Sequence, residues 1–213
     1  KFVPLEMPQE MNGLQILQRH PTGREYAFLL EGKEKFPVFV DANKKILSMP
    51  PIINSHDTGK ITGETKDVFI EVSGFDLEAQ KKAINILVTA LADLGGKIYA
   101  MDLEYDKPLG KIQTPNLTPE TMKIDINNVN KLVGLELKEK DLEKLLPRMG
   151  YDYAKGKVSI PAYRTDILHE VDIIEDIAIA YGYEHIVPII PKVATIGEEA
   201  MENRVSTKVS EIL

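Results

Sequence analysis

Between residues 166 and 181, apolar residues recur at steps of four, three, four and three: Ile167, Val171, Ile174, Ala178 and Tyr181. Residues at these steps share one face of an α-helix. Three more apolar residues widen that face: Ile173, Ile177 and Ala180. Asp166 is a residue type that favours N-caps, and Gly182 is one that favours helix ends. The pattern therefore predicts a well-buried helix over residues 166–181.

The rest of the chain alternates between helical and extended patterns. Helical spacing predicts helices over residues 9–20, 77–94, 127–134, 138–149 and 198–213. Apolar runs predict strands over residues 26–32, 35–49, 67–74, 97–106 and 122–126, and a hairpin over 151–161. Turns are predicted within the second of these strands, at Asp41 to Asn43, and in the hairpin, at Lys155-Gly156. Residues 52–62 are polar and are predicted to form a loop.

The helix over residues 77–94 has clear end signals. Asp76 is its predicted N-cap, and Gly95-Gly96 is predicted to end it. Its predicted core face consists of Ala83, Ile86, Leu87, Ala90 and Leu94.

Residues 107–119 contain three prolines and one glycine, a composition typical of a linker. Strands and helices lie on both sides of this segment. The predicted fold class is therefore α+β, with two domains: a mixed-sheet domain before the linker and a small helix-and-hairpin domain after it. A single continuous sheet running through both parts would contradict this prediction.

Four acids accompany the helix predicted over residues 166–181. Asp172, Glu175 and Asp176 lie at positions i, i+3 and i+4, so they share one side of the helix, and Asp166 precedes them. Carboxylates this close repel one another, and a hard cation with oxygen ligands would relieve the repulsion. Mg²⁺ suits such a site, because it binds one or two carboxylates and keeps several waters. The alternative is an acidic face exposed to water.

Composition limits the function classes. The 213 residues are 43% hydrophobic and 28% charged, as in ordinary globular proteins, and the formal net charge is −7. Binding of nucleic acid by bulk electrostatics normally requires a basic protein, so any contacts to RNA are expected to be local. The chain contains no cysteine, which excludes disulfides and cysteine metal sites and suits a cytosolic protein. Its first residues resemble neither a signal peptide nor an initiator Met, so we expect a piece of a longer chain.

Common catalytic motifs are missing from the sequence. It contains no dinucleotide fingerprint, phosphate loop, H-E-x-x-H or G-x-S-x-G. The spacing of the four histidines does not indicate a zinc site. His20 and His56 have polar neighbours and are predicted to be exposed, and His169 is predicted to lie near Asp172.

The run YRTDILHEVDIIEDIAIAYGYEHI resembles the magnesium-binding segment of the β subunit of phenylalanine–tRNA ligase, of the archaeal and eukaryotic cytosolic type. The family pattern is Arg-x-Asp, an Asp six residues later, two adjacent acids and then Gly-Tyr. This chain carries it at Arg164, Asp166, Asp172, Glu175, Asp176, Gly182 and Tyr183. The resemblance implies that the four acids bind Mg²⁺ close to the α subunit. Asp176 stands where a Glu is common and has a shorter reach.

A second run, ILSMPPIINSHDTGKITGETKDVFIEVSGFD, resembles the core of the editing domain of that family. The resemblance implies three parts: the later part of an editing domain over residues 1–112, a magnesium-binding domain over 113–193, and the start of a catalytic-like domain over 194–213. It further implies a cytoplasmic enzyme of two α and two β subunits that acts on tRNA(Phe). ATP and phenylalanine would bind the α subunit, so this chain alone should not aminoacylate.

The editing reaction that the resemblance implies is the hydrolysis of Tyr-tRNA(Phe). Tyrosine differs from phenylalanine by one hydroxyl, which a pocket with hydrogen-bonding groups can select. The candidates for such groups are Glu71 in the predicted strand and Asn54 and Ser55 in the predicted loop. Alternatively, Glu71 points outward from a half-buried strand, and Asn54 and Ser55 only form a turn.

Two other functions stay open at this point. The chain could belong to a free-standing RNA-binding or scaffold module without catalysis, or to a stand-alone hydrolase that edits in trans. Deacylation of Tyr-tRNA separates the first from an editing enzyme. An α subunit that co-purifies with the parent chain would argue against the second.

Overall fold

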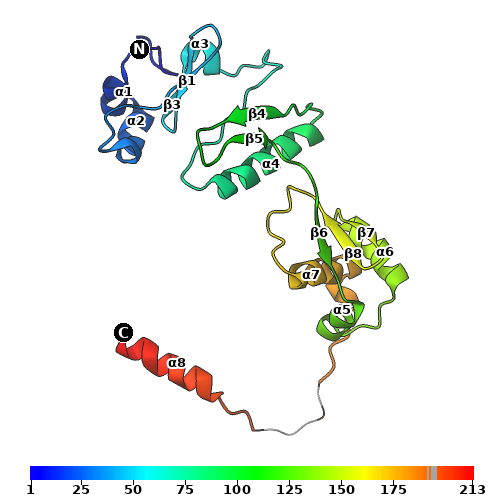
Figure 1. Cartoon of the computed structure of the whole chain (residues 1–213). Helices are drawn as coiled ribbons and strands as arrows, with labels where there is room; N and C mark the ends of the chain where they lie inside the picture. Colours follow the sequence, from blue (N-terminus) through cyan, green and yellow to red (C-terminus); the bar gives the residue numbers. More distant parts are fainter. Residues whose placement is uncertain (191, 193–195) are drawn as a thin grey trace.

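The computed structural model describes residues 1–190, 192 and 196–213. The strands of these residues form three separate sheets (Figure 1). Their buried side chains form two core clusters, one within residues 2–52 and one within residues 124–180. The described chain is therefore α+β, as predicted. Every strand pair within the described residues is antiparallel, so the expectation of a mixed sheet was wrong. Short connections suffice for antiparallel pairs, whereas parallel pairs need long crossovers.

The first part of the chain packs helices against a small sheet of order β1-β2-β3. Its elements are α1 (Gly13–Arg19), α2 (Pro21–Tyr26), the 3-10 helix η1 (Ala27–Leu30), β1 (Phe39–Val40), β2 (Ile46–Met49), β3 (Ile53–Asn54) and α3 (His56–Gly59). The helix predicted over 9–20 begins later, at Gly13, because Asn12 and Gln15 form a capping box there. The hairpin predicted within residues 35–49 is confirmed, and the Asp41 carboxylate accepts hydrogen bonds from the backbone of Asn43 and Lys45.

Three predictions for the first half of the chain were wrong. Residues 26–32 form the end of α2 and η1 rather than a strand, since a short apolar run does not distinguish strand from helix. Residues 67–74 pair with no strand among the described residues, and Val68 and Phe69 are half exposed. The predicted loop at 52–62 contains β3 and α3.

His20 is buried, although its polar neighbours predicted exposure. Its Nε2 lies 3.0 Å from the carbonyl oxygen of Leu5, and its Nδ1 lies 2.7 Å from the hydroxyl of Thr22. These two contacts satisfy both ring nitrogens, which explains how a polar ring is tolerated inside.

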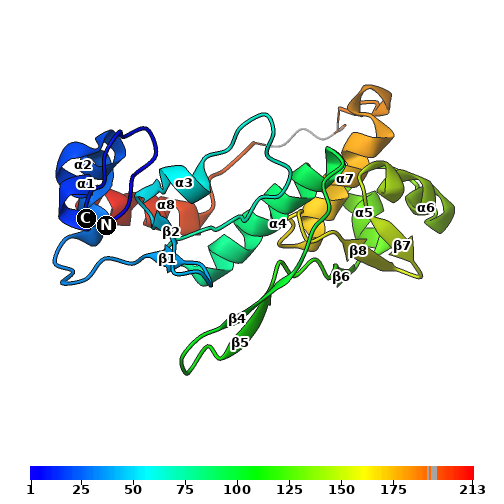
Figure 2. The same cartoon turned by 90° about the horizontal axis from the view of Figure 1, so that it is seen from above.

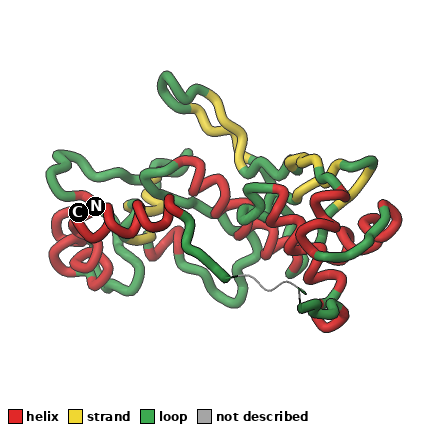
Figure 3. The backbone as a smooth tube through the Cα atoms, turned by 90° about the horizontal axis from the view of Figure 1, so that it is seen from below, coloured by secondary structure: helices red, strands yellow, loops and turns green. Residues whose placement is uncertain are grey.

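A helix and a hairpin follow: α4 (Leu77–Asp93), β4 (Met101–Glu104) and β5 (Lys111–Thr114). Asp76 caps α4 as predicted, accepting from the backbone N–H groups of Glu78 and Ala79. The predicted core face of α4 was wrong, because Ile84 and Val88 are buried while Ile86, Leu87 and Leu94 are exposed. The β4–β5 hairpin extends away from the helices (Figures 2 and 3). Its second strand, β5, lies inside the segment predicted to be a linker.

The second part combines three helices with a sheet of order β6-β8-β7. Its elements are β6 (Glu120–Lys123), α5 (Ile126–Val133), α6 (Glu139–Arg148), β7 (Asp152–Ala154), β8 (Lys157–Ile160), α7 (Glu170–Tyr181) and the 3-10 helix η2 (Tyr183–His185). The predicted helix at 138–149 and hairpin at 151–161 are confirmed. Lys155 and Gly156 both have positive φ at the hairpin turn, and glycine adopts that conformation easily. The N-cap of α5 is Asp125 rather than a residue of the predicted range.

Helix α7 supplies one wall of the second core. Ile173 and Ile177 are fully buried against α5, α6 and the sheet, together with Val129, Leu142, Leu146, Tyr151 and Val158. Val171, which the sequence pattern assigned to the buried face, is 48% exposed. The rest of the predicted stripe is confirmed, with Ile174, Ala178 and Ala180 buried as well and Tyr181 partly buried.

Beyond this core lies α8 (Met201–Ile212), which confirms most of the helix predicted over 198–213 and has no buried residue. The boundary predicted between residues 193 and 194 lies outside the described residues. Within those residues, no helix has the length and hydropathy needed to span a membrane.

Candidate functional site

The acidic segment consists of the loop that precedes α7 and the first two turns of that helix. Helix α7 begins at Glu170 with His169 as its N-cap, so the predicted cap at Asp166 was wrong. The His169 ring accepts a hydrogen bond from the backbone N–H of Val171 at 3.2 Å. Asp166 lies in the preceding loop, outside the helix.

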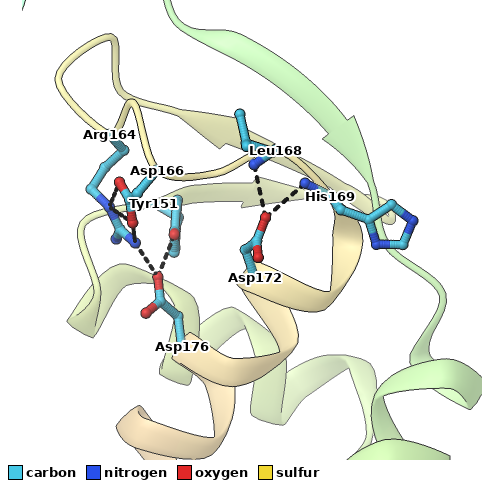
Figure 4. Close-up of polar contacts among 7 residues, drawn as sticks. All are labelled: Tyr151, Arg164, Asp166, Leu168, His169, Asp172 and Asp176. Atoms are coloured by element: carbon cyan, nitrogen blue, oxygen red, sulfur yellow. Dashed lines mark hydrogen bonds and ion pairs between the residues drawn. The ribbon is translucent and has the colours of Figure 1, made fainter. Parts of the chain in front are cut away.

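Asp172 closes the start of α7. One oxygen of its carboxylate accepts hydrogen bonds from the backbone N–H groups of Leu168, at 2.8 Å, and His169, at 2.7 Å (Figure 4). These donors hold the pKa of the Asp172 carboxyl below its usual range. The contact completes a capping box, so Asp172 has a structural role that the sequence analysis did not assign.

Arg164 binds two of the four acids at once. Its Nε lies 3.0 Å from Asp166 Oδ1, and its Nη2 lies 2.8 Å from Asp166 Oδ2, which makes a two-point contact. The same Nη2 lies 2.6 Å from Asp176 Oδ2 (Figure 4). The hydrogen bonds from Arg164 hold the pKa of Asp166 below its usual range, and those to Asp166 raise the pKa of Arg164.

Asp176 is buried, with 7% of its surface exposed. Besides the bond from Arg164, it accepts a hydrogen bond from the hydroxyl of Tyr151, a fully buried residue just before β7. The Arg164 guanidinium carbon lies 5.2 Å from the centroid of the Tyr151 ring, within cation–π range. Burial, followed by the contact with Asp176, raises the pKa of the Tyr151 hydroxyl. Tyr151, Arg164 and Asp176 thus form one inward-facing network.

Glu175, next to Asp176 in α7, is exposed to water. The four predicted ligands are therefore distributed over three environments: a capping box, a buried network and solvent. Among the described residues, no group of three or more His, Cys, Asp or Glu side chains is arranged to hold a metal ion. The arrangement in this structure does not fit one Mg²⁺ bound by all four acids, since Arg164 occupies oxygens of two of them.

The editing candidates lie in two places. Asn54 ends β3, and Ser55 is a buried N-cap whose hydroxyl accepts from the backbone N–H of Asp57 at 3.3 Å. Glu71 lies within residues 67–74, the predicted strand that forms no strand pair in the described residues, and accepts a hydrogen bond from the hydroxyl of Ser73. Within the part of the chain that the structure describes, no hydrogen bond joins Glu71 to Asn54 or Ser55. The structure thus brings Asn54 and Ser55 together and leaves Glu71 with Ser73.

Comparison with known proteins gives three consistent findings. Residues 122–183 match the family described as the tRNA synthetase B5 domain. The chain is 45% identical over 201 residues to the phenylalanine–tRNA ligase β subunit of Thermococcus gammatolerans, covering 92% of this chain and 35% of that one. It is 44% identical over 216 residues to that of Archaeoglobus fulgidus, covering 100% and 39%.

A known crystal structure is similar to the structure of this chain. An N-terminal fragment of the phenylalanyl-tRNA synthetase β subunit from Pyrococcus horikoshii superimposes with a TM-score of 0.80 at 44% identity, covering 86% of this chain and 53% of that one. The chain is homologous to the archaeal β subunit of phenylalanine–tRNA ligase. It spans about a third of the length of the curated β subunits that it matches.

The B5 match gives the acidic segment of this β-subunit homologue its context. Residues 122–183 run from the end of β6 through α7, so the match contains all four acids, Arg164 and Tyr151. The buried network therefore belongs to the B5 domain and not to a joint between domains.

Sequence reasoning missed Tyr151, and it did not pair Arg164 with Asp166 and Asp176. For Tyr151 one signal was available, since a Tyr directly after a helix-ending Gly is amphipathic and can place its hydroxyl inside. It also missed the contact of Arg148, whose Nη1 donates to the carbonyl oxygen of Ala180 at 2.5 Å. A cation near the carboxyl end of a helix complements the helix dipole.

Proposed function

We propose that the chain is part of the β subunit of a phenylalanine–tRNA ligase, which attaches phenylalanine to tRNA(Phe) together with an α subunit. The observation that carries the proposal is 44–46% identity to archaeal β subunits over 92–100% of the chain. The assembly would contain two α and two β subunits in the cytoplasm. ATP and phenylalanine would bind the α subunit, so the chain alone would not aminoacylate.

Mg²⁺ is proposed only for the assembled enzyme, near the contact with the α subunit. Glu175 is exposed, and the second oxygen of Asp172 accepts no hydrogen bond from the described residues. Mg²⁺ binds with one or two carboxylates when other groups and waters complete its shell. When bound there, the ion would neutralise acidic surface at the contact, and no step of the chemistry depends on it. Asp166 and Asp176 would stay with Arg164.

The first part of the chain, residues 1–112, is proposed to contribute to a site that hydrolyses Tyr-tRNA(Phe). Such a site must bind the tyrosine hydroxyl with groups that phenylalanine leaves unpaired. Glu71 is a strong acceptor beside the Ser73 hydroxyl, which makes it the leading candidate. Asn54 and Ser55, at the end of β3, supply an amide and a hydroxyl.

Glu71→Ala in the complete enzyme is expected to slow deacylation of Tyr-tRNA(Phe) by about tenfold or more, because a hydrogen bond to a charged group contributes roughly 1.5–3 kcal/mol. Charging of tRNA with phenylalanine should not change. The measurement is single-turnover release of tyrosine from preformed Tyr-tRNA(Phe). Glu64→Ala is a matched control, because Glu64 is an exposed Glu nearby in the chain.

Equal deacylation rates for both variants and the unmodified enzyme would remove Glu71 from the site. The same assay on Asn54→Ala and Ser55→Ala decides whether these two residues belong to the editing site. If the unmodified complete enzyme released no tyrosine, the editing proposal would be wrong, and an RNA-binding or scaffold function for this part of the chain would be favoured.

A further inference from the structure

Arg164 binds two acids, Asp176 of the inward-facing network and Asp166 of the loop before α7. The Asp176 side chain is only 10% exposed and the Arg164 side chain 19%, whereas that of Asp166 is 62% exposed. A buried carboxylate needs a compensating charge or proton, because its charged form is poorly solvated there. Arg164 supplies that charge from within the chain.

The geometry favours a guanidinium in this position. Arginine donates several N–H groups from a planar fork, so it can bind two carboxylates together, as its contacts to Asp166 and Asp176 show. Its guanidinium carbon lies over the Tyr151 ring, whose hydroxyl binds the same Asp176 oxygen. The backbone N–H of Arg164 donates to the carbonyl oxygen of Pro161 at 2.9 Å, which fixes the turn that carries the side chain.

We propose that Arg164 is the resident cation of the acidic segment: it occupies the position between Asp166 and Asp176 that a divalent metal would otherwise fill. Arg164 is thus a positioning residue that joins the loop before α7 to the helix. It follows that the isolated chain keeps its stability without divalent cations. Removal of the Arg164 charge should make the same segment dependent on them.

The test uses the 213-residue chain and thermal unfolding in EDTA or in millimolar MgCl₂, with KCl added to equalise ionic strength. The midpoint temperature of unfolding of the unmodified chain should be the same in EDTA and in MgCl₂. Arg164→Met keeps an apolar stem but removes the charge, and its midpoint in EDTA should fall by roughly 5–15 °C. MgCl₂ should restore part of that loss.

Two further variants keep the outcome decisive. Arg164→Lys retains the charge and should stay insensitive to MgCl₂. Arg164→Met combined with Asp176→Asn removes the buried negative charge as well, so it should fold in EDTA and show no response to MgCl₂ even where Arg164→Met alone does not fold. Destabilisation of the unmodified chain by EDTA would overturn the proposal, and so would an Arg164→Met variant whose midpoint is the same in both buffers.

Discussion

Replacing Asp176 with alanine is expected to lower the free energy of unfolding of the chain by roughly 2–4 kcal/mol. The substitution leaves the buried Tyr151 hydroxyl without its acceptor and removes one of the two carboxylates bound by Arg164. A buried polar group that loses its partner destabilises the folded state by its full desolvation penalty. The measurement is urea unfolding followed by circular dichroism.

Two variants control this experiment. Asp176→Asn keeps an oxygen that can accept from Tyr151 and Arg164, so it should destabilise less than the alanine variant. Glu175→Ala changes the adjacent acid, which is exposed, and should stay within about 0.5 kcal/mol of the unmodified chain. Equal effects of Asp176→Ala and Glu175→Ala would contradict the burial of Asp176.

Ile177→Ala is expected to destabilise the chain by about 2–5 kcal/mol, the usual range for a fully buried isoleucine. Ile177 has no exposed surface and packs in the core of the B5 domain, where the lost methyl and methylene groups leave a cavity. Urea unfolding of the chain measures the change.

Ile179→Ala is the matched control for this second substitution. It removes the same atoms from the same helix, but Ile179 is 46% exposed. The expected loss is therefore smaller by at least about 1 kcal/mol. The reverse order of the two losses would show that α7 is rotated relative to the structure described above.

The residues of α7 show how much of the buried face the sequence could predict. Helical spacing correctly indicated a buried helix after residue 166 and most of its buried face, but it included the exposed Val171 and left out the buried Asp176. The buried positions of α7 are Ile173, Ile174, Asp176, Ile177, Ala178 and Ala180. Because Asp176 is charged, hydropathy assigned it to the solvent side.

The acids illustrate a second limit. Spacing placed Asp172, Glu175 and Asp176 near one another, and the three do share part of the helix surface. The three acids differ in their contacts. Asp172 accepts from backbone N–H groups, Glu175 is exposed to water, and Asp176 binds Arg164 and Tyr151. Tyr151 is 25 residues from Asp176 in the sequence, and no local pattern gives such a contact.

Strand predictions failed where pairing was missing. The segment VFIEV at 68–72 has the apolar residues of a strand, yet strands are stabilised by partners and not by propensity alone. The hairpins at residues 39–49 and 152–160 were predictable because their turn residues and both strands lie close together in the sequence. The boundaries at residues 112 and 193 stay predictions.

Aminoacylation by the complete protein tests the central claim most directly. The complete protein that contains this chain is expressed with and without the phenylalanine–tRNA ligase α subunit of the same organism, and attachment of phenylalanine to tRNA(Phe) is measured. We predict that the two subunits co-purify and that only the assembly charges tRNA(Phe). A complete protein that does not bind the α subunit, or an assembly that attaches no phenylalanine, would contradict the proposed function.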